Sequence, residues 1–137
     1  MTKVFLDTNV LVYAVDLRDP TKHERAIEVV ERQIRDGTGV ISTQVLQEFA
    51  SVALAKLHQA VETVLAELSV LEVMEIVPIT SALVRRALEL HGLHRINYWD
   101  AAILAAAEAA HCAWLWSEDF APGSLYGLLR AENPLAT

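Results

Sequence analysis

Four acidic residues lie at positions from which their side chains could act together. Asp7 and Asp119 each follow a short apolar run that is typical of a strand, whereas Glu48 and Asp100 lie within helical patterns. Because the carboxyl ends of parallel strands meet at one edge of a sheet, we expect these acids to come together there. Four carboxylates repel one another unless a cation lies among them, and an all-oxygen site favours Mg²⁺ or Mn²⁺ over Zn²⁺. Such an ion would activate water and shield a phosphate group.

Each acid also has a structural role open to it. Asp7 could cap the helix that follows it, and Asp119 could be a turn residue. Asp100 could stabilise a helix N-terminus together with Asn97, and each of these roles would contribute about 0.5 to 1 kcal/mol. Glu48 flanks an apolar helical stripe, where solvated or salt-bridged residues are common. For each residue taken singly, both interpretations stay open.

Charge and cysteine content exclude other classes of protein. The net charge is −7, from 11 Lys and Arg against 18 Asp and Glu, so the chain lacks the basic surface of a protein that binds nucleic acid by neutralising its phosphates. Cys112 is the only cysteine, which excludes an intrachain disulfide and a zinc site built from several thiolates. The five histidines form no convincing metal-binding set.

Length and hydropathy predict a globular protein. The 137 residues, 53% of them hydrophobic, fit a single domain over residues 1–137. The longest nearly uncharged stretch, residues 101–116, is too short to span a bilayer and is interrupted by Glu108 and His111. Only Lys3 and a brief apolar run precede Asp7, which does not resemble a secretory signal. We therefore expect a cytoplasmic protein without a membrane segment.

Strand and helix patterns alternate along the chain. Strands are predicted at Lys3–Leu6, Gly39–Ile41, Glu75–Ile79 and Ala113–Trp116, with one more between Gly127 and Pro134. Helices are predicted at Val10–Asp16, Lys22–Arg35, Gln44–Leu57 and Ala60–Val73, from Thr80 or Ser81 to Gly92, and from Asn97 to about His111. Thr21 is expected to cap the second helix. This alternation predicts an α/β fold, a three-layer sandwich whose mainly parallel central sheet is flanked by helices.

Four motifs in these positions resemble those of a known family. They are DTN at residues 7–9, QEF at 47–49, YWDAAI at 98–103 and SEDF at 117–120. Together, and in this order, they resemble the PIN-domain nucleases over essentially the whole chain. The closing NPL at residues 133–135 resembles the end of the small VapC-type toxins of type II toxin-antitoxin pairs.

The resemblance implies roles for individual residues. It implies that the metal-binding and catalytic acids are Asp7, Glu48, Asp100 and Asp119. It implies that the supporting polar groups are Thr8, Asn9, Ser117 and Glu118. Glu118 could also replace Asp119 as the fourth acid, and the sequence leaves that choice open.

The implied activity is Mg²⁺-dependent hydrolysis of RNA phosphodiester bonds by an endoribonuclease, with Mn²⁺ as a possible substitute. The implied partners are RNA and a cognate antitoxin protein whose segment would occupy the groove near the acids and offer Arg or Lys to them. A housekeeping RNA-processing nuclease of the same fold is an alternative. The apolar residues of the helices predicted at 44–57 and 60–73 exceed what one side of a small sheet can cover, which predicts a homodimer.

Two further functions remain as alternatives. An aspartate-dependent phosphatase or phosphotransferase of the haloacid-dehalogenase type also carries an Asp after its first strand, but it typically needs a second Asp two positions later, where this chain has Asn9. A non-catalytic α/β module would act only by binding a partner. Metal-dependent degradation of RNA would separate the nuclease from both alternatives.

Overall fold

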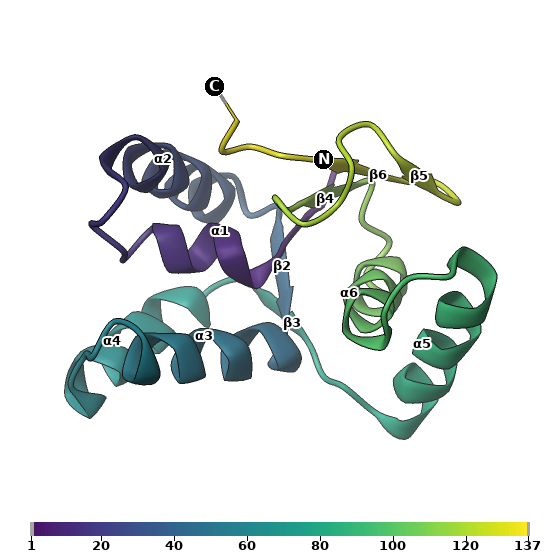
Figure 1. Ribbon diagram of the computed structural model, residues 1–137, viewed down its shortest axis with the longest axis horizontal. Helices are drawn as coiled ribbons and strands as arrows, with labels where there is room; N and C mark the ends of the chain where they lie inside the picture. Colours follow the sequence, from purple (N-terminus) through teal and green to yellow (C-terminus); the bar gives the residue numbers. More distant parts are fainter. Residues whose placement is uncertain (1, 137) are drawn as a thin grey trace.

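A six-stranded sheet forms the centre of the protein in the computed structural model, which describes residues 2–136 (Figure 1). The strand order is β3-β2-β1-β4-β6-β5. All neighbouring strands pair in parallel except β5 and β6, which form an antiparallel hairpin. The strands are β1 (Val4–Leu6), β2 (Gly39–Ser42), β3 (Glu75–Val77), β4 (Trp114–Trp116), β5 (Leu125–Tyr126) and β6 (Leu129–Glu132).

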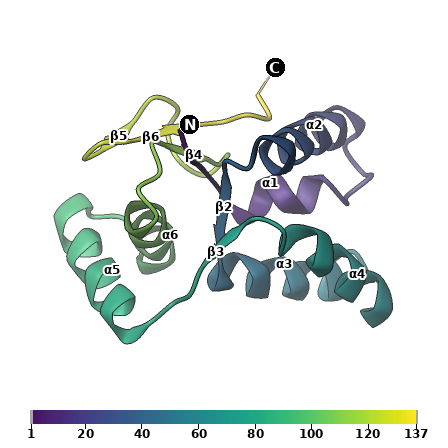
Figure 2. The same cartoon turned by 180° about the vertical axis from the view of Figure 1, so that it is seen from behind.

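Six helices cover the two faces of this sheet. They are α1 (Thr8–Tyr13), α2 (Pro20–Asp36), α3 (Thr43–Ala55), α4 (Val61–Leu71), α5 (Ser81–His94) and α6 (Tyr98–Ala109). Figures 1 and 2 show α1 to α4 on one side of the strands and α5 with α6 on the other. The predicted α/β class, with a mainly parallel sheet between helical layers, is therefore confirmed.

The chain changes direction across the sheet at β1. Its neighbours are β2 on one side and β4 on the other, and both pair with it in parallel. The chain therefore moves outward from β1 through β2 to β3 and then crosses to β4 on the opposite flank. In open parallel sheets such a reversal leaves a crevice beyond the carboxyl ends of the two central strands. Asp7 follows β1 and Ser117 follows β4 at this point.

Buried apolar side chains from both helical layers meet on the sheet. Phe5 of β1 and Leu115 of β4 are fully buried, as are Ala101 and Ala106 of α6. The alanine-rich sequence of α6 fits this position because small side chains allow a helix to approach a sheet closely. No helix within residues 2–136 is long and apolar enough to cross a membrane.

Three predicted helices have different bounds in the structure. Helix α1 spans Thr8–Tyr13, where Val10–Asp16 was predicted. Helix α2 begins at Pro20 with Asp19 as its N-cap, whose carboxylate accepts a hydrogen bond from the backbone N–H of Lys22, so Thr21 is not the cap. Proline is well tolerated at the first helical position because its missing N–H would have no partner there. Gly92 does not end α5, which continues to His94 and closes at Arg95 in the left-handed conformation.

The strand predicted between Gly127 and Pro134 is confirmed as β6, and the chain adds a short strand before it that was not predicted. This added strand, β5, has two residues, and Gly127 adopts a φ of +65° in the turn between β5 and β6. A strand as short as β5 has no detectable alternation of apolar and polar residues, which is why the sequence pattern missed it. The hairpin extends the sheet beyond β4.

Two glycines should respond in opposite directions to substitution by alanine. Gly92 lies inside α5 with open space around its Cα, so Gly92→Ala should raise the free energy of unfolding by about 0.5 to 1 kcal/mol. A Cβ at Gly39 would lie 2.7 Å from Sδ of Met74 and 3.0 Å from Cβ of Gln33, so Gly39→Ala should lower it by about 1 to 3 kcal/mol. Urea denaturation of both variants tests this, and a destabilised Gly92→Ala protein would contradict the helical assignment.

Candidate active site

Asp7 is the most buried acid of the candidate site. It lies directly after β1, is the N-cap of α1 and is 5% exposed. Its Oδ1 accepts a hydrogen bond of 2.7 Å from the backbone N–H of Thr8, and its Oδ2 accepts one of 2.7 Å from the hydroxyl of Ser117. The capping role and a place in the site are therefore both realised by the same side chain.

Glu48 is oriented by two donors on different helices. Its Oε2 accepts a hydrogen bond of 2.9 Å from the hydroxyl of Thr8, and its Oε1 accepts one of 2.8 Å from the amide of Gln44. Thr8 follows Asp7 directly, so this bond ties the first turn of α1 to the middle of α3. Gln44 lies one helical turn before Glu48, a spacing at which two side chains on a helix meet.

Ser117 and Asn9 join the ends of β1 and β4. Ser117 is fully buried, and its hydroxyl oxygen accepts hydrogen bonds from the backbone N–H of Asp119 at 3.0 Å and the amide of Asn9 at 3.3 Å. The same amide donates to Oδ2 of Asp119 at 3.0 Å. Asp119 is exposed to solvent, and these hydrogen bonds fix its orientation beside the buried Asp7.

Asp100 enters from the opposite helical layer, in the first turn of α6. Asn97 is the N-cap: its Oδ1 accepts from the backbone N–H of Asp100 at 2.9 Å, and its Nδ2 donates to Oδ2 of Asp100 at 2.8 Å. The capping interaction foreseen for this pair therefore exists. It also fixes the direction of the Asp100 carboxylate, which has its other oxygen free of this contact.

Hydrogen bonds link the segments that carry these four acids: Ser117 joins Asp7 to the end of β4, Thr8 donates to Glu48, and Asn9 donates to Asp119. Gln44 joins α3 to the start of α6 beside Asp100. Burial is the largest effect on Asp7 and raises its pKa to about 6, against hydrogen bonds from Ser117 and Thr8 that lower it. Burial also raises the pKa of Asp100, against the hydrogen bond from Asn97. The negative charges of Glu48 and Asp119 raise the pKa of both residues. Acids from four separate segments of the chain thus repel one another at one edge of the sheet.

Glu118 has different surroundings from its neighbour Asp119. Its Oε2 lies 2.9 Å from Nζ of Lys22 on α2 in an ion pair, and Lys22 also lies over the ring of Tyr13, 4.8 Å from its centroid. The backbone N–H of Glu118 donates to Oδ1 of Asn9 at 3.3 Å. The backbone of this residue therefore supports the cluster, while its carboxylate is turned to a cation outside it.

The donor set suits a hard divalent cation. Within residues 2–136 no three Asp, Glu, His or Cys side chains are close enough to hold a metal ion as they stand. Mg²⁺ needs only one or two protein carboxylates, however, because water and substrate phosphates supply its other ligands. Each oxygen of Asp7 and of Glu48 accepts one hydrogen bond and keeps lone pairs for a cation. Oxygen ligands with mutual repulsion therefore fit Mg²⁺ or Mn²⁺.

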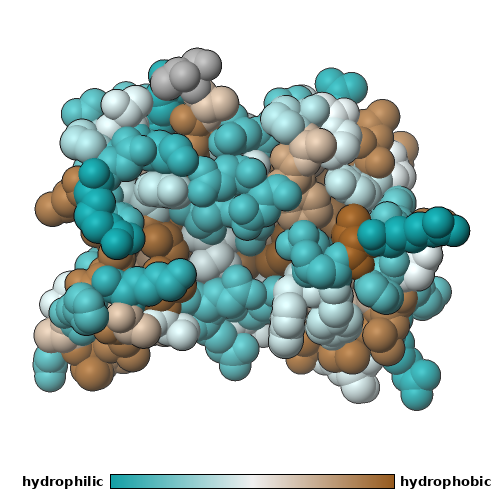
Figure 3. Space-filling model, in the orientation of Figure 1, coloured by the Kyte–Doolittle hydropathy of each residue, from teal (hydrophilic) through white to brown (hydrophobic). Residues whose placement is uncertain are grey.

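The cluster lies on a polar part of the surface. In Figure 3 hydrophilic side chains gather over the middle of the face shown, where Figure 1 places the start of α1. Hydrophobic side chains gather to the lower left, over α4, and to the right, over α5. Asp119 is exposed, Glu48 and Asp100 are partly exposed, and only Asp7 is buried, so a polar ligand can reach three of the four acids.

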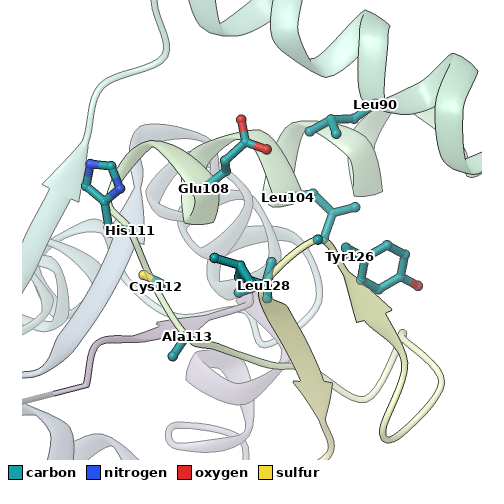
Figure 4. Close-up of a pocket in the computed structure, with 10 residues that line it drawn as sticks. Leu90, Leu104, Glu108, His111, Cys112, Ala113, Tyr126 and Leu128 are labelled. Atoms are coloured by element: carbon teal, nitrogen blue, oxygen red, sulfur yellow. The ribbon is translucent and has the colours of Figure 1, made fainter.

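A cavity of about 420 Å³ elsewhere in the molecule does not carry comparable chemistry. It lies between α5, α6 and the β5–β6 hairpin, and Figure 4 shows Leu90, Leu104 and Leu128 around it. Its acid, Glu108, is paired with Arg86 at 2.7 Å. No member of the acidic cluster lines this cavity.

The sequence patterns missed two residues that orient the site. Gln44 is 6% exposed and links Glu48 to the backbone carbonyl of Trp99, to which it donates at 3.3 Å. Its spacing of four residues from Glu48 was a usable signal. Lys22 binds Glu118 from a distance of 96 positions in the chain, and no local pattern could have indicated that pair.

Comparison with known families agrees with this geometry. The family model described as the PIN domain matches residues 4–121. This range includes every member of the acidic cluster. None of the curated proteins matches the sequence.

Solved structures share the fold over nearly the whole chain. A toxin-antitoxin complex from Klebsiella pneumoniae is 25% identical, with a TM-score of 0.68 and coverage of 96% of this chain and 98% of that one. DNA-bound VapBC from Salmonella typhimurium is 18% identical, with a TM-score of 0.70 and coverage of 98% and 99%. VapC20 from Mycobacterium tuberculosis, a toxin that cleaves the sarcin-ricin loop, is 17% identical, with a TM-score of 0.67 and coverage of 85% and 92%.

The raised pKa of Asp7 should make the metal-free protein less stable as the pH rises. Below about pH 4 the carboxyl is protonated in both the folded and the unfolded chain. Between about pH 4 and 6 the unfolded chain releases this proton while the folded chain keeps it, so the free energy of unfolding falls, by about 1.4 kcal/mol for each unit of pKa difference. Above pH 6 this contribution is constant. Asp7→Asn should remove the fall.

Urea denaturation in EDTA at pH 4, 5, 6 and 7 measures this contribution. Asp36→Asn, which changes an exposed carboxylate at the end of α2, is the matched control and should keep the pH dependence of the parent. An Asp7→Asn protein with the same pH dependence as the parent would show that the carboxylate of Asp7 is not held out of water.

Proposed function

The chain belongs to the PIN-domain family, and from that premise we propose that it is a metal-dependent endoribonuclease acting as the toxin of a toxin-antitoxin pair. The observation that carries the proposal is the cluster of Asp7, Glu48, Asp100 and Asp119 at the carboxyl edge of the central strands. Membership of this family removes the grounds for a phosphatase of the haloacid-dehalogenase type. A non-catalytic module would have no need for four acids that repel one another.

The four acids would hold Mg²⁺, or Mn²⁺ in its place. When bound, the ion would supply activation of the attacking water and neutralisation of the negative charge that develops on the phosphate. Ser117 and the backbone of Thr8 hold the carboxylate of Asp7 in one orientation. Thr8 and Gln44 do the same for Glu48, and Asn9 does so for Asp119. These donors keep the acids in position and reduce the repulsion between them.

RNA is the proposed substrate. The acidic chain can accept a phosphodiester only where a cation screens the repulsion, which confines the reaction to the acidic cluster. The similarity to a toxin that cleaves the sarcin-ricin loop supports RNA over DNA. A housekeeping RNA-processing nuclease with the same site is the alternative to a toxin.

A cognate antitoxin is the proposed protein partner. The similarity over 96% of this chain to a toxin-antitoxin complex supports this assignment. Carboxylates without a cation attract Arg and Lys side chains, so a basic antitoxin segment in the groove would compete with the metal ion and inhibit cleavage, more weakly as salt rises. The proposal includes cytoplasmic localisation, where such a toxin would meet its RNA.

Asp100→Asn should separate activity from stability. The substitution keeps the shape of the side chain and removes one of the repelling charges, so the melting temperature in EDTA should hold or rise. Cleavage of single-stranded RNA in Mg²⁺ should fall by a factor of about 100 or more, and Mg²⁺ should raise the melting temperature less than in the parent. Melting curves with EDTA and with Mg²⁺, run beside an RNA cleavage assay, measure both effects.

EDTA should abolish cleavage by the parent. If Asp100 only stabilised the N-terminus of α6, Asp100→Asn would lose about 0.3 to 1 kcal/mol and keep its activity. A destabilised and fully active variant would therefore end the assignment of Asp100 as a metal ligand.

Substitution of the adjacent acids Asp119 and Glu118 should affect RNA cleavage differently and so identify the fourth metal ligand. Asp119→Asn should lower RNA cleavage by a factor of about 10 or more. The negative charge of Asp119 raises the pKa of both Asp7 and Asp100, so Asp119 lies near these two acids. Glu118→Gln should change cleavage by less than about threefold, because the carboxylate of Glu118 is paired with Lys22. Initial rates at saturating Mg²⁺ test the pair, and the reverse order of effects would assign the fourth position to Glu118.

The protein is also proposed to form a homodimer. Apolar side chains on α3 and α4 and beyond the end of α4 are largely exposed, namely Leu54, Val61, Leu65, Val70 and Val73. Symmetric pairing would bury them. Analytical ultracentrifugation at tens of micromolar should find a dimer, and Leu65→Glu should shift it towards the monomer, whereas Leu128→Glu, at the exposed tip of the β5–β6 hairpin, should not. A monomeric parent would contradict the dimer.

A further inference from the structure

One large aromatic side chain lies exposed beside the acidic cluster. Trp99 is 65% exposed and immediately precedes Asp100 in the first turn of α6. The other two tryptophans, Trp114 and Trp116, lie in β4 and are partly buried, and the guanidinium of Arg130 lies over the ring of Trp114. Packing of the described residues therefore does not account for the indole of Trp99.

Trp99 nevertheless makes two contacts with its surroundings, one through its ring and one through its backbone carbonyl. Its ring makes an edge-to-face contact with Tyr98, with the ring centroids 5.2 Å apart and an angle of 79° between the planes. Tyr98 itself packs against the hydrophobic core. The backbone carbonyl of Trp99 accepts a hydrogen bond of 3.3 Å from Gln44, which also donates to Glu48. The backbone of Trp99 is thus fixed relative to Glu48 and Asp100, and Tyr98 supports the indole on one edge, while most of the residue faces solvent.

The charges around the cluster leave little affinity for the backbone of a nucleic acid. The chain carries a net charge of −7, and four acids lie at the site itself. Lys22, which approaches the site from α2, is already paired with Glu118. A substrate with a polyanionic backbone needs another source of binding energy here. Stacking of a base on an aromatic ring supplies such energy without any positive charge.

We propose that Trp99 stacks on an unpaired nucleobase next to the scissile phosphate and so positions single-stranded RNA over the acids, an inference that rests on the proposed function. Trp99 is a substrate-positioning residue, since it reaches a base and not the reacting atoms. Stacking on one exposed ring tolerates every base, so Trp99 favours unpaired over paired RNA without fixing a sequence. A paired base has its faces covered by its neighbours in the duplex and cannot stack on the indole.

Steady-state cleavage of a fluorogenic single-stranded RNA tests this role in four proteins. Trp99→Ala should raise KM by about 5- to 100-fold and leave kcat within about threefold of the parent. Trp99→Phe, which keeps an aromatic face, should recover most of that loss. Leu128→Ala is the matched control, because it removes an exposed apolar side chain on the distant hairpin, and it should change neither constant. All four proteins should melt within a few degrees of one another, since Trp99 is largely solvent-exposed.

The same RNA with abasic nucleotides on both sides of the mapped cleavage position gives a second readout. Removal of the bases should raise KM for the parent and hardly affect Trp99→Ala, because that variant has already lost the stacking partner. An unchanged KM in Trp99→Ala, or an abasic effect of equal size in both proteins, would overturn the proposal. Loss of binding to the purified antitoxin with no change in KM would also overturn it and assign Trp99 to the protein partner.

Tryptophan fluorescence separates failure of this inference from failure of the proposed function. Adding the single-stranded RNA should quench the emission of the parent and leave that of Trp99→Ala nearly unchanged. If the parent cleaves no RNA, the proposed nuclease function fails, and quenching that disappears in Trp99→Ala would still support the stacking. A parent that cleaves RNA without any quenching assigned to Trp99 would overturn the stacking and leave the nuclease function standing.

Discussion

The site depends on one constraint, the burial of the Asp7 carboxylate among other carboxylates. Asp7 is 5% exposed, and its pKa is raised to about 6 although Ser117 and Thr8 both donate to it. Without these two donors the charged form would be still less stable, because burial alone penalises it. The surrounding residues can therefore be understood as supports that keep Asp7 ionisable at neutral pH in a position where a cation would stabilise it further.

The topology of the sheet supplies that position. Strands β1 and β4 are neighbours in space but more than 100 residues apart in sequence, and their parallel register puts Asp7 and Ser117 side by side after the last paired residues, Leu6 and Trp116. Helix α3 brings Glu48 from one helical layer and α6 brings Asp100 from the other. Short polar side chains in the first turns join these elements, so the geometry of the site is specified by caps and strand ends and not by a long loop.

Much of this arrangement could be predicted from the sequence, and the failures have physical reasons. Strand ends and helix starts carry strong local signals, which is why Asp7, Asp100 and Asp119 were expected together. The prediction failed at Gly92, because a single glycine weakens a helix without ending it. The ion pair of Lys22 with Glu118 depends on long-range packing that no local pattern contains. The metal-binding role of the acids remains a prediction.

The most direct measurement of that role is the position of a metal ion in crystals soaked in MnCl₂, located by anomalous scattering. The account predicts a peak at coordination distance, about 2.0 to 2.3 Å, from carboxylate oxygens of the cluster, including that of Asp100, and no peak at this place in crystals of Asp100→Asn. A well-ordered Mn²⁺ ion bound elsewhere, with none at the acids, would contradict it.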